Sequence, residues 1–138
     1  MKLFNFNNYE KQLSEKDKVG VDQYRNTRLE IPPRYQAPEV YYGKPYGYSA
    51  DSYSFGLLLW QIISFRVPYS CHDDASPQWS IIYEDQLRPM INNDWPRHMK
   101  VLMNGCWDEK PSYRLGFSTI CSIFDRYFAS QEGISRNG

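Results

Sequence analysis

The sequence has no excess of charge of either sign, since 16 Lys and Arg residues balance 16 Asp and Glu residues among its 138 positions. A neutral chain has no overall field that attracts a polyanion, so we expect no nucleic-acid partner. Cysteine is scarce, with Cys71, Cys106 and Cys121 in no CxxC spacing and behind no recognisable secretory leader. This pattern predicts reduced thiols in a cytoplasmic protein, with Cys106 and Cys121 buried.

Long hydrophobic runs are also absent. The longest, residues 55–65, has about 11 residues and contains Gln61, whereas a helix that spans a bilayer needs about 20. We therefore expect no membrane partner. Aromatic residues, in contrast, make up 17% of the chain, with 12 Tyr, 7 Phe and 4 Trp, which is typical of a folded domain rather than a disordered segment.

The fold class that the sequence predicts is mainly α. Residues 49–64, with Ser49 as N-cap, are apolar on nearly every side, which predicts a buried central helix. A second helix is expected to begin near Pro96 and a third to span residues 117–129, each packing one side against the central helix. The predicted contact residues are Met99, Leu102, Met103 and Cys106 in the second helix, and Phe117, Ile120, Cys121, Phe124 and Phe128 in the third.

The remaining segments are predicted to be mostly irregular. Residues 7–33 are polar and end in Pro32 and Pro33, which predicts a long loop, and loops of this length inside a domain are usually functional or disordered. Between residues 67 and 93, the only candidate helix is "WSIIYEDQ" at residues 79–86. The only strand we expect lies near residues 2–6, and residues 131–138 form a predicted disordered tail.

Three motifs occur in a fixed order along the chain. They are "RYQAPEV" at residues 34–40, "YSADSYSFGLLLWQI" at residues 48–62 and "CWDEKPSYRLGF" at residues 106–117. Together with "LRPMI" at residues 87–91 and "WP" at residues 95–96, they resemble the C-terminal (large) lobe of a eukaryotic protein kinase, in the tyrosine-kinase-like group. The resemblance runs from about residue 2 to residue 128 and implies the helical large lobe of the protein kinase-like fold.

The resemblance implies structural roles for five residues. Glu39, which follows Pro38, and Arg114 correspond to a buried ion pair that clamps the activation segment to the helical core; two unrelated surface charges are the alternative. Asp51 corresponds to an aspartate that accepts hydrogen bonds from the catalytic loop. If its carboxylate were buried without those donors, the unsatisfied group would lower the stability of the fold. Trp107 corresponds to an aromatic wedge in the core.

Other parts of the family's machinery are missing from the sequence or altered in it. There is no GxGxxG, no VAIK-like lysine and no HRD-like loop, so no catalytic and no cofactor-binding residue is intact. The opening "KLFNFN" resembles K-L-x-D-F-G with Asn5 in place of the Mg²⁺-binding aspartate, unless it is an unrelated strand that only looks similar. Pro32 stands where the family has a Ser or Thr in the substrate loop.

Three smaller candidates for functional sites have weaker support from the sequence. Residues 70–74, "SCHDD", lack the paired spacing of a zinc site and predict a solvated loop, and His98 is expected to be solvated on the polar side of its helix. Tyr24 and Thr27 stand where activation-loop phosphorylation occurs in a working kinase.

These observations predict three parts: residues 1–33 as the remnant of the metal-binding turn with an activation-like loop, residues 34–130 as the helical core, and the tail. The family transfers the ATP γ-phosphate to protein Ser, Thr or Tyr with Mg²⁺. We expect this chain to use neither cofactor and to be catalytically inactive. Two alternatives are a protein-binding scaffold and the C-terminal half of an active kinase from an incomplete gene model. A lobe without its other half exposes an apolar side that invites a protein partner or aggregation.

Overall fold

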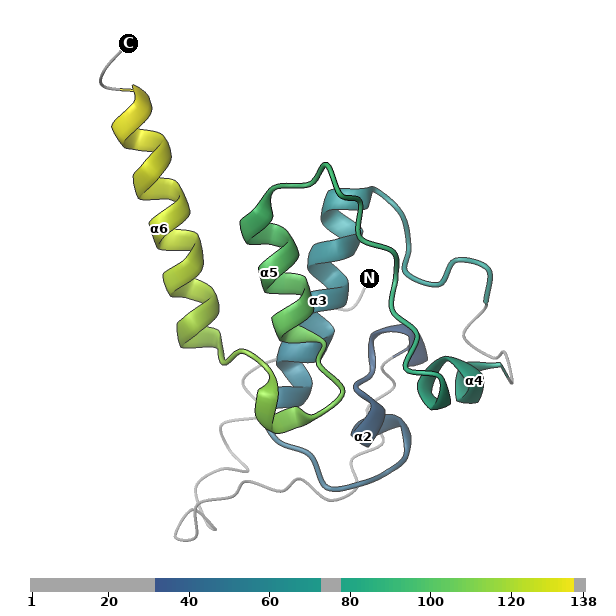
Figure 1. Ribbon diagram of the computed structural model, residues 1–138. Helices are drawn as coiled ribbons and strands as arrows, with labels where there is room; N and C mark the ends of the chain where they lie inside the picture. Colours follow the sequence, from purple (N-terminus) through teal and green to yellow (C-terminus); the bar gives the residue numbers. More distant parts are fainter. Residues whose placement is uncertain (1–31, 73–77, 136–138) are drawn as a thin grey trace, which may run out of the picture.

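The computed structural model describes residues 32–72 and 78–135, and these residues form helices and connecting loops without a strand (Figure 1). This confirms the mainly α fold class. The predicted strand near residues 2–6 and the loop up to residue 31 lie outside the described residues. In chain order the elements are η2 (Pro33–Tyr35), α2 (Pro38–Tyr41), α3 (Ser49–Ser64), α4 (Trp79–Glu84), α5 (Arg97–Cys106), η3 (Pro111–Tyr113) and α6 (Phe117–Ser135).

The core lies between α3 and α5, which run side by side in Figure 1. Leu57 of α3 and Leu102, Met103 and Cys106 of α5 are completely buried there. Gly56 allows this close approach, because a Cβ at that position would lie 2.9 Å from the Cβ of Cys106. The α3–α5 contact is therefore the packing unit to which the other elements are attached.

Helix α3 has the predicted bounds but not the predicted burial. Ser49 is its first helical residue and Tyr48 is the N-cap, so the predicted capping role of Ser49 is wrong. Leu58 and Ile62 are exposed, although a helix with apolar residues on nearly every side was expected to be covered all round. Helix α3 is central to the core on one side only.

Helix α5 follows its prediction closely. It begins at Arg97, directly after Pro96, and buries Leu102, Met103 and Cys106, which recur at the spacing of one helical face.

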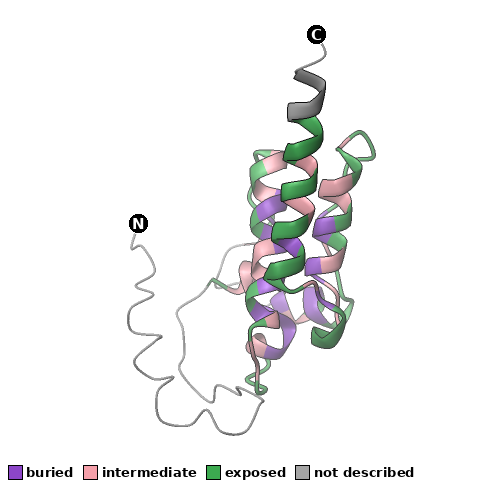
Figure 2. Cartoon of the chain, turned by 90° about the vertical axis from the view of Figure 1, so that its left-hand side faces the viewer, coloured by how far each residue is buried: buried purple, intermediate pink, exposed green. Residues whose placement is uncertain are grey.

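Helix α6 differs from its prediction in two respects. Of the five side chains expected to pack, only Ile120 is buried, and Phe117, Cys121 and Phe128 are exposed. Figure 2 shows much of α6 in the colour of exposed residues. The helix also continues to Ser135, so residues 131–135 are helical and not part of a disordered tail. In Figure 1, α6 leans away from α5 towards its C-terminal end, which leaves much of its surface without a covering element among the described residues.

A second, smaller apolar cluster surrounds α4, the helix predicted from "WSIIYEDQ". Trp79, Ile82 and Tyr83 are buried in it, and the ring of Tyr83 stacks on that of Tyr41 in α2 at a centroid distance of 4.2 Å. This contact attaches α4 to the segment that carries the first kinase-like motif.

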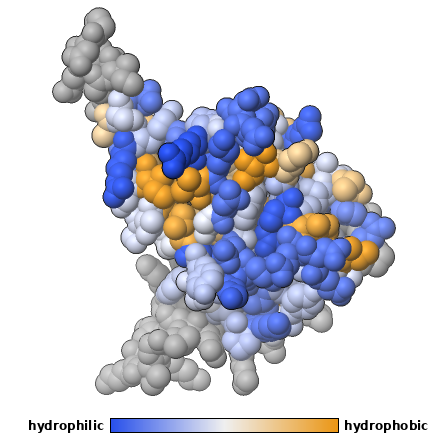
Figure 3. Space-filling model, viewed as in Figure 1, coloured by the Kyte–Doolittle hydropathy of each residue, from blue (hydrophilic) through white to orange (hydrophobic). Residues whose placement is uncertain are grey.

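The surface is mainly hydrophilic on the face shown in Figure 3, with apolar side chains gathered in separate patches. Within residues 32–72 and 78–135, no helix combines the length and the apolar composition needed to span a bilayer.

Candidate functional site

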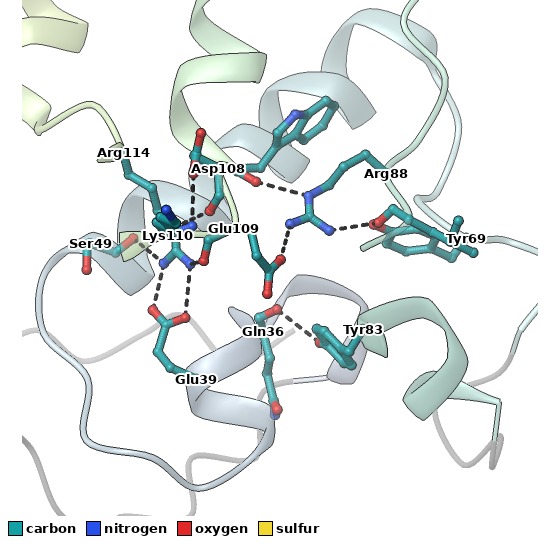
Figure 4. A network of polar contacts seen from close by, with 12 residues as sticks. Gln36, Glu39, Ser49, Tyr69, Tyr83, Arg88, Asp108, Glu109, Lys110 and Arg114 are labelled. Atoms are coloured by element: carbon teal, nitrogen blue, oxygen red, sulfur yellow. Dashed lines mark hydrogen bonds and ion pairs between the residues drawn. The ribbon is translucent and has the colours of Figure 1, made fainter. Parts of the chain in front are cut away.

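Glu39 and Arg114 form a buried, two-pronged ion pair (Figure 4). Glu39 lies in the first turn of α2, and Arg114 follows η3 in extended conformation. Arg114 Nη1 donates to Glu39 Oε1 at 2.6 Å, and Nη2 donates to Oε2 at 2.9 Å. The two charges stay buried because the planar guanidinium matches the carboxylate geometry and satisfies both oxygens.

Arg114 uses its other donors on backbone carbonyls. Nε donates to Asp108 O at 2.8 Å, and Nη1 also donates to Ser49 O at 3.0 Å, at the start of α3. One side chain therefore fixes three segments: α2, the first residue of α3, and the loop that leads into η3. The ion pair therefore holds α2 against the start of α3.

A second arginine, Arg88, extends this network. Its Nη2 donates to Glu109 Oε2 at 2.9 Å, and its Nε donates to the carbonyl of Trp107 at 3.0 Å. The guanidinium carbons of Arg88 and Arg114 each lie 5.0 Å from the ring centroid of Tyr53, which is buried in α3. Burial raises the pKa of Tyr53, against the opposing effect of the nearby Arg88 charge. The arginines of both ion pairs thus pack against one aromatic ring.

Asp51 is exposed in the first turn of α3 and is not the buried, unsatisfied carboxylate that was considered above. Within the described part of the chain, no hydrogen bond or ion pair engages its side chain. The pKa of Asp51 is raised because neighbouring protein atoms partly desolvate its carboxylate. The side chain of Asp51 therefore offers a hydrogen-bond acceptor at the N-terminal end of α3.

A shallow hollow of about 470 Å³ lies on the side of η2, lined by Pro32, Arg34, Tyr35, Val67 and Ser70. Arg34 donates to the carbonyls of Pro68 (3.1 Å) and His72 (3.0 Å), which ties the loop after α3 to η2. The residues that line the hollow thus come from two segments that lie more than 30 positions apart in the sequence.

The other predicted site residues fall into two groups. Trp107 is buried, Pro38 is buried at the start of α2, and Pro32 is exposed at the N-cap of η2. Asn5, Tyr24 and Thr27 lie outside the described residues. In the described ranges, no three His, Cys, Asp or Glu side chains gather into a set that could hold a metal ion.

Some features of the site were missed or predicted wrongly from sequence. Nothing in the spacing indicated the contacts of Arg88 with Glu109 and Tyr53. His98 is only partly exposed to solvent: its ring stacks on Tyr127 of α6 at 3.8 Å, and its Nε2 is buried without a hydrogen-bond partner among the described residues. Cys121 is exposed although burial was expected, because it lies on the uncovered side of α6.

Comparison with known proteins places these features in a family. The family described as protein tyrosine and serine/threonine kinase matches residues 11–124. Among curated proteins of Dictyostelium discoideum, dual specificity protein kinase shkA is 39% identical over 112 residues, which are 81% of this chain and 20% of shkA. Dual specificity protein kinase shkD is 36% identical over 99 residues, 72% of this chain and 13% of shkD. A third, shkC, is 34% identical over 113 residues, 82% of this chain and 22% of shkC.

The chain thus spans about a fifth or less of the length of these relatives. The matched region contains Glu39, Arg114 and the α3–α5 core, so the similarity and the geometry concern the same residues. The chain belongs to the protein tyrosine and serine/threonine kinase family and contains part of its catalytic domain.

Proposed function

We propose that this polypeptide is the substrate-side helical part of a kinase large lobe and that, on its own, it does not transfer phosphate from ATP. The observation that carries the proposal is a contrast within the chain. The ion pair of Glu39 and Arg114 that frames the lobe is complete, whereas the sequence contains no phosphate-covering glycine loop, no VAIK-like lysine and no HRD-like loop. Phosphoryl transfer depends on positioning and charge stabilisation by those missing groups.

The opening residues support the same proposal. In the register of the family motif, Asn5 replaces the carboxylate that holds Mg²⁺. An amide offers one neutral oxygen to a cation that prefers carboxylate, so metal affinity at this position should be severely reduced. Pro32 in the substrate loop has neither a hydroxyl nor an N–H to hold a catalytic aspartate.

An active-kinase alternative rests on the relatives, whose names describe dual specificity protein kinases. In a longer polypeptide that also supplied the missing groups, the described residues would form the substrate side of a working enzyme for protein hydroxyls. The transcript sequence upstream of Met1 tests this directly. An in-frame catalytic loop and glycine loop would favour the alternative, and in-frame stop codons would exclude it.

A second candidate function, protein binding without catalysis, is favoured by the hollow beside η2. Three apolar or aromatic side chains, Pro32, Tyr35 and Val67, line it, and backbone carbonyls hold Arg34 in its wall. Such a surface suits an extended peptide segment with apolar side chains. A peptide array probed with the chain and with Val67→Asp tests it: binding to a defined set of peptides that the variant loses supports the function, and equal binding excludes it.

The main proposal is tested by incubating the full chain with labelled ATP, Mg²⁺ and a mixed peptide library of Ser, Thr and Tyr acceptors. We expect no incorporation above the chain-free background, both for the natural sequence and for Asn5→Asp, since a restored metal ligand does not restore the missing groups. Time-dependent incorporation that Glu39→Gln abolishes would show that the chain itself is active, and would overturn the proposal.

A further inference from the structure

A second hollow, of about 380 Å³, lies between α5 and the loop that leads from α4 to α5 (Figure 1). Its walls come from both segments: Arg88, Pro89, Ile91 and Asn93 from the loop, and Lys100, Asn104 and Trp107 from α5 and its C-cap. The three residues from the helix recur at intervals of four and three residues, so they share one face. The hollow therefore has an apolar wall at Pro89 and Ile91 and a wall of hydrogen-bonding side chains on α5.

Trp107 brings an unused hydrogen-bond donor to this hollow. The residue is only 4% exposed, yet its indole N–H makes no hydrogen bond within the described part of the chain. Solvent reaches this N–H, because the one buried side-chain polar atom without a partner among the described residues is Nε2 of His98. The other tryptophan of the core, Trp60, donates its indole N–H to the carbonyl of Met90 at 2.9 Å. A buried indole normally has such a partner, so Trp107 has a vacant donor where it lines the hollow.

Lys100 supplies the positive charge of the hollow. Its Nζ donates to the backbone carbonyl of Asn93 at 2.8 Å, which holds the ammonium group between the helix and the loop. Within residues 32–72 and 78–135, Lys100 takes part in no ion pair. Arg88 differs, because its charge is paired with Glu109 at 2.9 Å and its remaining nitrogens donate to the carbonyls of Trp107 and Leu87. The hollow therefore carries one positive charge that no carboxylate of the described residues neutralises.

The donors of the hollow restrict the kind of ligand. The indole N–H of Trp107 and the ammonium of Lys100 can only donate, and the exposed amides of Asn93 and Asn104 can both donate and accept, as a peptide group requires. A carboxylate only accepts, at about four lone-pair sites, and its single charge matches that of Lys100. A phosphate monoester carries a charge of about −1.5 to −2, which one lysine does not balance. The donors and the charge together favour a carboxylate.

We propose that this hollow binds a peptide carboxylate, which accepts hydrogen bonds from the indole N–H of Trp107 and the ammonium of Lys100. The amides of Asn93 and Asn104 bind the adjoining peptide groups, and an apolar side chain next to the carboxylate contacts Ile91. The carboxylate belongs to a Glu or Asp side chain or to the C-terminus of a partner protein. The inference goes beyond the proposed function, since it assigns a binding site away from the hollow beside η2.

The test follows the indole N–H signals of the 4 tryptophans by NMR in the full, ¹⁵N-labelled chain. The probe is a short peptide with blocked ends and one Glu between two Leu residues, and the matched control peptide has Gln in place of Glu. The Glu peptide should shift the Trp107 indole signal saturably, with a Kd below about 1 mM, and the Gln peptide should bind at least about tenfold more weakly. The Trp60 indole signal should stay in place, because its N–H already has a partner.

Variants assign the contacts, and the same spectra show whether each variant is folded. Lys100→Gln should weaken binding of the Glu peptide at least about threefold and reduce its salt dependence, because it removes the charge that faces the carboxylate. Asn104→Ala should weaken binding about threefold through the loss of one hydrogen bond. Lys110→Gln is the matched control: it removes the same charge from an exposed residue outside the hollow, and the affinity should stay within about twofold.

A third peptide, with Gln in place of Glu and a free C-terminal carboxylate, separates the two sources of the carboxylate. Saturable binding of this peptide alone supports a chain terminus as the ligand, and binding of the Glu peptide alone supports an acidic side chain. Equal binding of the Glu and Gln peptides, a Trp107 signal that none of the peptides moves, or equal effects of Lys100→Gln and Lys110→Gln would overturn the inference. Tighter binding of a phosphoserine peptide than of the Glu peptide would also overturn it, because the ligand would then be a phosphate.

Discussion

The Arg114 guanidinium holds the Glu39 carboxylate through two parallel bonds of 2.6 and 2.9 Å, across 75 positions of sequence. The Arg114 side chain is fully buried and that of Glu39 is 9% exposed. The same guanidinium donates to the first residue of α3. The lobe is therefore held together at a point where α2, α3 and η3 converge, and most of our predictions follow from that point and from the α3–α5 core.

Glu39→Gln should lower the free energy of unfolding by about 3–5 kcal/mol, because it leaves the buried Arg114 charge without its counterion. Denaturation in urea, followed by circular dichroism, measures the difference. Glu109→Gln is the matched control: it removes the partner of Arg88, but Glu109 is 35% exposed and its loss should cost about 1 kcal/mol or less.

A double variant separates the charge effect from packing. Glu39→Met combined with Arg114→Met removes both charges, and it should recover much of the stability that Glu39→Gln loses. If Glu39→Gln and Glu109→Gln cost the same, the ion pair is not the anchor described above.

The contact between α3 and α5 should not tolerate a methyl group at residue 56. In Gly56→Ala the new Cβ would lie 2.9 Å from the Cβ of Cys106, so the helices must move apart. We expect a loss of about 1–3 kcal/mol in urea denaturation. Gly116→Ala, where no atom lies within 4 Å of the new Cβ, should cost less than about 1 kcal/mol. Equal costs would contradict the packing of α3 on α5.

The three cysteines should differ in reactivity. Burial raises the pKa of the Cys106 thiol to about 12, so almost no thiolate forms at pH 8, and the side chain is inaccessible. Cys71 and Cys121 are free and exposed. A thiol-disulfide exchange reagent with a chromogenic leaving group should titrate these two rapidly and Cys106 only after unfolding. Three equal rates would show that the core is open.

Alkaline pH should unfold the chain cooperatively. Burial raises the pKa values of Tyr53 and Tyr83 above the ordinary value of 10.0. The folded state therefore keeps these protons while the unfolded state releases them, so stability is complete below pH 10 and falls as pH rises beyond it. The limiting slope is about 1.4 kcal/mol per pH unit for each tyrosine.

Tyrosinate absorbance and urea denaturation at pH 8 to 11 measure this effect together. The buried tyrosines should ionise only as the helical signal is lost. Normal titration of every tyrosine with the helical signal intact would contradict their burial.

The helices and the ion pair could be predicted from the sequence, for different reasons. The spacing of apolar residues identifies the face of a helix that is expected to be buried, and in α5 that face is buried. The pairing of Glu39 with Arg114 was expected only from the family motifs, because no local pattern links residues 75 positions apart.

The sequence could not predict which faces of the helices are covered by another element. Spacing shows that Ile62 and Phe128 are apolar, but not whether another element lies opposite, and in this chain none of the described residues covers them. The stacking of His98 on Tyr127 and the contacts of Arg88 depend on how distant segments cross, which leaves no signature in spacing.

The most direct test of the account is the melting temperature of the isolated chain with and without Mg-ATP. A ligand that binds only the folded state stabilises it by RT ln(1 + [L]/Kd), so the melting temperature rises once the ligand concentration exceeds Kd. We predict a single cooperative transition that Mg-ATP does not shift, for the natural sequence and for Asn5→Asp alike. An upward shift of several degrees would show that the chain contains a nucleotide site and would contradict the account.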